Sequence, residues 1–111
     1  MLGTFVTALP FFNDAVAATK VVVKAGNTQL FLLKLVNTTA AAAYLQMFNK
    51  LTADVTVGTT VPDMTFRLAA NESVTIPLNI PLGFSVGLVL AGTTTATGNT
   101  GAAISVSALF E

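Results

Sequence analysis

The chain has 111 residues, of which 53% are hydrophobic and only 9% are charged. Its length fits a single domain, and five basic residues balance five acidic ones, so no net charge would attract nucleic acid or anionic lipid. Cysteine and histidine are absent, which excludes disulfides and thiolate metal sites and removes the commonest general base and zinc ligand.

Residues 1–18 differ from the remainder because they are apolar and aromatic without clean alternation. They lack the basic start and the cleavage site of a signal peptide, so we expect them to stay in the mature chain. They are predicted to be either the first strand of the domain or an arm that packs on a neighbouring subunit, with one short helical turn at 14–19. The arm interpretation uses aromatic anchors, which bury large areas at low entropy cost. These anchors are Phe5, Leu9, Phe11 and Phe12.

Strand signals dominate residues 19–111, which are expected to form one domain. Seventeen Thr, thirteen Val and three Ile supply β-branched side chains, which suit a pleated, half-buried surface. The tight-turn pair Gly26-Asn27 separates two strands and predicts a hairpin. The last four segments alternate with the period of two that is typical of half-buried strands. Strands are predicted at 19–25, 28–36, 42–48, 64–69, 73–80, 84–91 and 104–110.

Two longer loops, 50–63 and 92–103, complete the pattern, and a short strand at 55–57 would raise the strand count from seven to eight. Pro77 lies inside a strand pattern but cannot donate to a ladder, so its strand is expected at a sheet edge or at a bulge. Seven or eight strands in this length predict an all-β fold. We expect an antiparallel β-sandwich of the Greek-key or jelly-roll type, with a closed β-barrel as the alternative.

One stretch carries no charge at all: from Ser73 to Phe110 the chain has thirty-eight uncharged residues. Polar and turn residues cut this stretch into pieces that are too short to span a membrane. The cores of protein interfaces are depleted of charge. The composition therefore favours the subunit of an assembly over a merely hydrophobic, poorly soluble domain.

Side chains that could carry chemistry are sparse. No Ser-x-x-Lys spacing accompanies the serines, and the carboxylates are isolated, so neither a nucleophilic site nor a glycosidase pair is predicted. Asp54 and Asp63 share one loop, but no Asp-x-Asp series supplies a calcium site. Lys20, Lys24 and Lys34 are better explained as edge lysines that oppose aggregation than as a phosphate-binding stripe. We expect no catalytic, cofactor-binding or metal site, and no enzyme activity.

Several motifs, taken in chain order, point to a family. They read Asn-Thr-Thr-Ala-Ala-Ala-Ala-Tyr-Leu-Gln-Met-Phe-Asn at 37–49, Val-Gly-Thr-Thr-Val-Pro at 57–62, Leu-Ala-Ala-Asn-Glu-Ser at 68–73, Gly-Phe-Ser-Val-Gly-Leu at 83–88 and Ala-Gly-Thr-Thr-Thr-Ala-Thr at 91–97. This series resembles small β-sandwich virion proteins and domains of tailed bacteriophages, over roughly residues 19–110, which is most of the chain. The resemblance implies a capsid decoration (cement) protein, a head-fibre domain or a tail part, and it brings no catalytic residues.

Composition and resemblance together predict a non-enzymatic virion structural protein, made in the host cytoplasm. It would be a capsid decoration subunit that binds the major capsid protein and its own copies, most simply as a homotrimer, without direct contact to nucleic acid or membrane. The outer strand faces that carry Thr65, Thr75, Ser85 and Val89 are expected to contribute to trimer contacts. The alternative is a carbohydrate- or receptor-binding β-sandwich of a phage fibre or tail, although the chain offers only Tyr44 and no Trp as a glycan platform.

Overall fold

The computed structural model describes residues 8–111, which form eight strands and one short 3₁₀ helix. Within this range no helix is long and apolar enough to cross a membrane. The elements are β1 (Leu9–Val16), β2 (Val21–Ala25), β3 (Thr28–Asn37), β4 (Ala43–Phe48), η1 (Thr52–Asp54), β5 (Met64–Leu68), β6 (Ser73–Phe84), β7 (Gly87–Thr93) and β8 (Ile104–Phe110).

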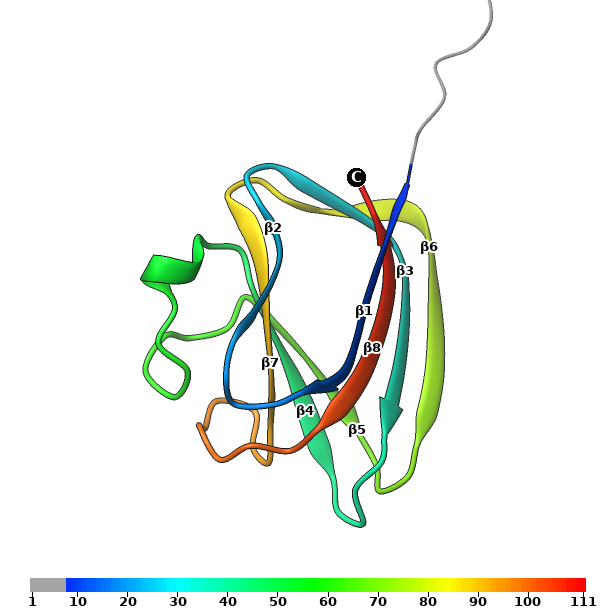
Figure 1. The fold of residues 1–111 in the computed structure, drawn as a ribbon, viewed down its shortest axis with the longest axis vertical. Helices are drawn as coiled ribbons and strands as arrows, with labels where there is room; N and C mark the ends of the chain where they lie inside the picture. The colour runs from blue at the N-terminus through cyan, green and yellow to red at the C-terminus, as the bar shows by residue number, and fades with distance from the viewer. Residues whose placement is uncertain (1–7) are drawn as a thin grey trace, which may run out of the picture.

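The strands form two four-stranded antiparallel sheets, which face each other in Figure 1. The first sheet has the order β1-β8-β3-β6, and the second sheet has the order β2-β7-β4-β5. The pairs β1–β8, β2–β7, β3–β6 and β4–β5 nest inside one another along the chain, as in one long hairpin ribbon. The pairs β3–β8 and β4–β7 then join successive turns of the ribbon. Such a wrapped ribbon is a jelly roll, so the predicted sandwich is confirmed and the two sheets do not close into a barrel.

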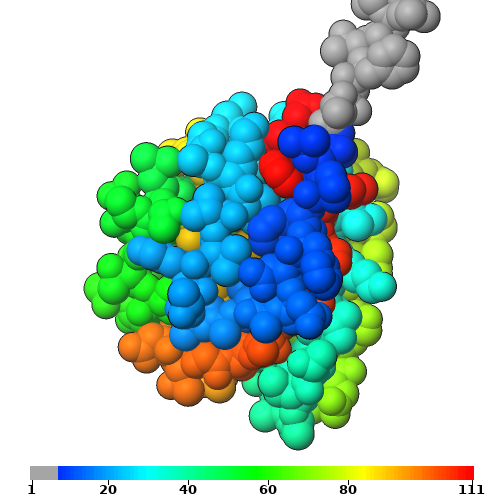
Figure 2. Space-filling view, in the orientation of Figure 1, coloured from blue at the N-terminus to red at the C-terminus, as the bar shows by residue number. Residues whose placement is uncertain are grey.

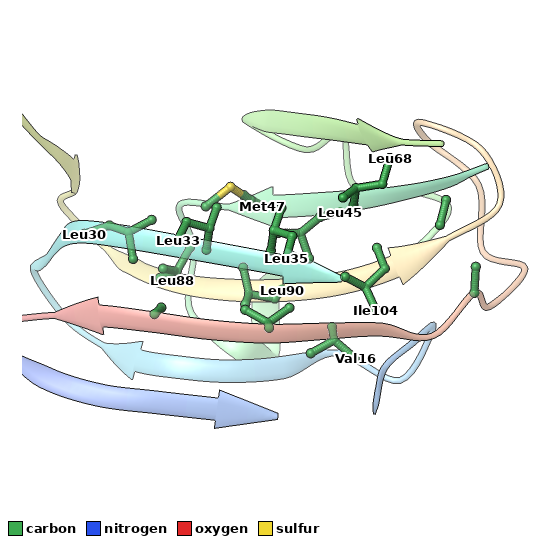
Figure 3. Packing of buried hydrophobic residues seen from close by; sticks show 14 of the residues in the cluster. Val16, Leu30, Leu33, Leu35, Leu45, Met47, Leu68, Leu88, Leu90 and Ile104 are labelled. Carbon is green, nitrogen blue, oxygen red and sulfur yellow. The ribbon is translucent and has the colours of Figure 1, made fainter. Parts of the chain in front are cut away.

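The main core lies between the sheets and is built from the inward positions of alternating strands (Figure 3). In β3, Leu33 and Leu35 point inward, and Leu45 of β4 and Leu90 of β7 meet them from the second sheet. All four side chains are at most 1% exposed. Burying a leucine of this kind contributes about 1.5–3 kcal/mol, so the apolar alternation of the sequence is the main source of stability.

Near the N-terminus, the structure contains the predicted first strand but not the predicted helical turn. Leu9–Val16 form β1 and pair with β8, and residues 1–7, including Phe5, lie outside the described residues. The helical turn predicted at 14–19 is wrong, because β1 continues through Val16. A single helical turn gains little by itself, whereas a strand beside β8 gains ladder hydrogen bonds and the burial of Val16.

The predicted hairpin around Gly26-Asn27 is also wrong. Gly26 does make a tight turn, with a φ of 92°, but β2 pairs with β7 in one sheet and β3 pairs with β6 and β8 in the other. The turn is therefore a corner between the sheets. The expected strand at 55–57 does not form either, because Val55 follows η1 and packs beneath the loop.

Pro77 was expected in a strand at a sheet edge or at a bulge, and this expectation is confirmed. It lies in β6, which is an edge strand of the first sheet, and the β3–β6 register shifts directly beside it, between Leu30 and Leu32. The shift leaves residues 78–81 of β6 opposite Phe31 alone. Ile80 lies in this bulge and is 85% exposed, the highest value among the large apolar residues of the described chain.

Candidate docking surface

The outer face of the second sheet is covered by the chain's own loops. Residues 49–63 and 94–103 both lie on this side of the sandwich (Figure 1). Beneath them Phe48, Val55, Val89 and Ala91 form a second, smaller apolar cluster in which each residue is at most 1% exposed. This cluster explains why β7 is buried along its whole length instead of alternating.

Polar contacts fasten these loops to the second sheet. The ammonium of Lys20 donates hydrogen bonds to the carbonyl oxygens of Thr52 (2.7 Å) and Val55 (2.5 Å), which ties the η1 loop to the segment before β2. The side chain of Asn49 accepts a hydrogen bond of 2.8 Å from the backbone N–H of Val86. These groups satisfy backbone atoms of the covering loop and of the neighbouring turn, so Lys20 acts here as a structural residue.

The outer face of the first sheet, by contrast, carries no covering loop in the part of the chain that is described (Figure 1). Strand register places its outward side chains, because the residues between them point into the core. We call this surface the open face. It consists of Pro10, Phe12 and Asp14 of β1, Ser105, Ser107 and Leu109 of β8 with Glu111 after them, Gln29, Leu32, Lys34 and Val36 of β3, and Ser73, Thr75 and Pro77 of β6.

An apolar row crosses the open face from one edge to the other. Pro10 pairs with Leu109, Leu109 pairs with Leu32, and Leu32 pairs with Pro77. Four adjacent strands span about 14 Å, so this row is as wide as the sheet. Phe12 lies in the next row and is 66% exposed. The open face thus carries a continuous apolar strip that crosses all four of its strands.

Charge is distributed unequally between the two layers. Of the five basic and five acidic residues, six belong to the second sheet, the segment before it and its covering loop. These six are Lys20, Lys24, Lys50, Asp54, Asp63 and Arg67. The open face carries three charged residues among fourteen positions: Lys34 on β3, Asp14 at the β1 bulge and Glu111 just after β8. The layer whose outer face is covered by its own loops therefore also carries most of the charge.

Two of the predicted contact residues lie on the open face, at opposite edges of the first sheet. Phe12 and Thr75 occupy one row of the open face, which runs from Phe12 through Ser107 and Lys34 to Thr75. Leu9 is 52% exposed at the start of β1, whereas Phe11 is half-buried and packs against the domain's own core. Phe11 therefore contributes to folding of its own subunit.

The other predicted contact residues lie elsewhere. Thr65 is exposed on β5 of the second sheet, and Ser85 is exposed in the turn between β6 and β7 rather than on a strand face. The expectation for Val89 is wrong: it is 0% exposed, because the loop 49–63 folds over the outer side of β7. The apolar row was not predicted from the sequence, since its members come from four strands and only strand register aligns them.

A shallow groove of about 350 Å³ opens between the segment before β2 and the covering loops. No aromatic side chain lines it, and the ammonium of Lys20 already serves two carbonyl groups. The groove therefore offers no ring on which a sugar could stack. Its lining consists of Ala18, Thr19, Lys20, Val55, Thr56, Val57 and Asn99. Residues 8–111 also contain no group of three or more acidic side chains that could hold a metal ion.

Comparison with other proteins adds no relative. No protein-family model, curated protein sequence or solved structure matches the chain. The fold, the open face and the motif series at 37–97 are therefore the basis of the proposed function.

Proposed function

We propose that the chain is a non-enzymatic structural protein of a tailed-phage virion, a decoration subunit that stabilises the head by binding the major capsid protein. The observation that carries this proposal is the contrast between the two outer faces: one is covered by the chain's own loops, and the other has no covering loop among residues 8–111 and is crossed by an apolar row. Depletion of charge is typical of interface cores. The jelly roll supports the proposal by analogy only, because this fold also serves lectins and cupins.

The open face suits repeated binding to a protein lattice. Its apolar row supplies favourable burial of about 25 cal/mol per Å² of apolar area removed from water. Its serine and threonine hydroxyls cost far less to desolvate than charged groups would. A subunit that occupies many equivalent sites, or that binds as an oligomer, gains avidity without a single strong contact. Modest contacts at each site are then sufficient to stabilise a shell.

The subunit is proposed to assemble as a homotrimer. Thr65 lies on the second sheet, away from the open face, and stays available to a sister chain. Light scattering coupled to gel filtration measures this directly: a trimer has three times the chain mass of 11.4 kDa. A monomer at all accessible concentrations would contradict the trimer and leave binding to the shell to be measured separately.

Virus particles provide the test of function. We expect quantitative mass spectrometry of purified particles to find the chain in many copies per head. Particles produced without the gene should release their DNA at a lower temperature, and addition of the purified chain should restore the wild-type value. Particles that contain no copies of the chain, and whose heat stability is independent of the gene, would overturn the proposal.

A further inference from the structure

We infer that two prolines, Pro77 of β6 and Pro10 of β1, protect the edges of the first sheet against strand addition by a second copy of the chain. β1 and β6 are the edge strands of this sheet, and among residues 8–111 no strand pairs with their outer sides. Such an edge presents unpaired N–H and C=O groups, to which a strand of another chain can pair. The protection goes beyond the proposed function, because it acts on the chain whatever the chain later binds.

β6 is the edge that most needs protection. It has twelve residues, more than any other strand of the described chain, and none of them is charged. The lysines expected to oppose aggregation lie elsewhere: Lys34 is on β3, which has a neighbour on each side, and Lys20 and Lys24 belong to the segment of β2 in the second sheet. Uncharged segments of high β-propensity pair readily when they lack proline. The protection of β6 therefore depends on its backbone rather than on charge.

Hydrogen bonds place the missing N–H of Pro77 on the outer side of the sheet. The N–H of Asn37 on β3 donates to the carbonyl oxygen of Glu72 (2.8 Å), so residue 72 directs its carbonyl toward β3. Backbone groups alternate in direction along an antiparallel strand, and the register is regular from Ser73 to Pro77. Pro77 therefore faces away from β3. A strand added to this edge meets a pyrrolidine ring where it needs a donor.

The opposite edge has the same arrangement. Glu111 and Gln29 exchange two backbone hydrogen bonds of 2.8 and 3.0 Å, so Glu111 faces β3. Alternation along β8 then directs Phe110 toward β1, where it pairs with Leu9. Pro10, the next residue of β1, consequently directs its missing N–H away from β8. Both edges of the first sheet thus lack a donor, at the two ends of the apolar row.

The bulge of β6 extends the protection beyond Pro77. Residues 78–81 lie opposite Phe31 alone, and the last of them is a second proline, Pro81. A bulge interrupts the regular row of backbone groups and twists the edge. Residues 73–76 are then the regular edge before Pro77, which is shorter than the usual strand of about 5–6 residues.

Substitution of Pro77 in the full chain tests the inference. Pro77→Thr restores the N–H, so the variant should associate beyond the wild-type oligomer at an at least about tenfold lower concentration, because a symmetric contact gains two ladder hydrogen bonds. Pro77→Lys restores the same N–H but adds an edge charge, so it should behave as the wild type does. Pro62→Thr is the matched control, because Pro62 lies in the covering loop outside any strand. Light scattering over a concentration series measures the mass of each variant.

Additional association by Pro77→Thr that Pro77→Lys and Pro62→Thr do not show supports the inference. Wild-type masses for Pro77→Thr at every concentration overturn it. Equal association by Pro77→Lys or Pro62→Thr also overturns it, because neither variant creates an uncharged edge with a free donor. Pro10→Thr applies the same test to β1, and wild-type masses for this variant overturn the inference for that edge. The purified chain suffices for these measurements, so their result is independent of whether virus particles contain the chain.

Discussion

The side-chain amide of Gln46 donates a hydrogen bond of 2.7 Å to the hydroxyl of Thr93, and neither side chain is exposed to solvent. The same amide nitrogen also donates to the carbonyl oxygen of Gly98 at 3.0 Å. β4 and β7, which carry Gln46 and Thr93, are adjacent in the second sheet. This small polar centre therefore fixes the loop after β7 over the outer face of the second sheet.

Thr93→Val should destabilise the fold. The valine has nearly the same shape but leaves the Gln46 amide without its shortest contact, and loss of such a buried partner costs about 1–3 kcal/mol. Urea unfolding measures the change. In a double-mutant cycle with Gln46→Met, we expect a coupling of about 1 kcal/mol. Additive effects of the two substitutions would show that the pair does not act as a unit.

Gly92→Ala should lower stability because backbone atoms of neighbouring segments leave no room for a Cβ at this position. A Cβ at this position would collide with the carbonyl oxygens of Val16 and Ala102, which belong to segments that close the core. Overpacking of this kind costs about 1–3 kcal/mol. Gly83→Ala is the matched control, since no atom lies within 4 Å of its Cβ. It should be neutral or stabilising by up to about 1 kcal/mol, because alanine restricts the unfolded chain. Similar thermal midpoints for both variants would contradict the packing around Gly92.

Asn37→Ala should release two loops at once. The buried Asn37 amide donates to the carbonyl oxygens of Ala41 (2.8 Å) and Ala69 (2.9 Å), and its side-chain oxygen accepts from the hydroxyl of Thr39 (2.7 Å). We expect a loss of about 2–4 kcal/mol in chemical denaturation, since several buried groups lose their partner. Asn79→Ala removes an exposed amide and should stay within about 0.5 kcal/mol of wild type. A loss below 1 kcal/mol for Asn37→Ala would contradict this role.

Alanine substitutions at the buried Leu35 and the exposed Ile80 should differ in their effect on the free energy of unfolding. Leu35 is 0% exposed, and Leu35→Ala should cost about 2–5 kcal/mol through lost burial and cavity formation. Ile80→Ala should change the free energy of unfolding by about 0.5 kcal/mol or less, since the side chain is 85% exposed. Calorimetry of both variants measures the difference. A large loss for Ile80→Ala would mean that its bulge stabilises the fold.

The sequence predicted those features of the fold that depend on local pattern. Alternation in 104–110 marked β8 with its correct bounds, and Pro77 marked an edge strand. Pairing was harder, because Gly26 makes the same kind of tight turn at a corner between sheets as in a hairpin. The sequence could not show that the outward side of Val89 is buried, since the covering loop 49–63 is distant from it in sequence. The apolar row of the open face likewise depends on a register that four separated strands set together.

The central claim is that a partner covers the open face in the assembled particle, while the outer face of the second sheet keeps the covering that its own loops provide. Carbene photolabelling with mass spectrometry measures this for individual side chains in the free chain and in the particle. We expect Phe12 and Leu109 to lose most of their labelling on assembly, and Val61 and Leu51 of the covering loop to retain theirs. Unchanged labelling of Phe12 and Leu109, or protection confined to Val61 and Leu51, would contradict the claim.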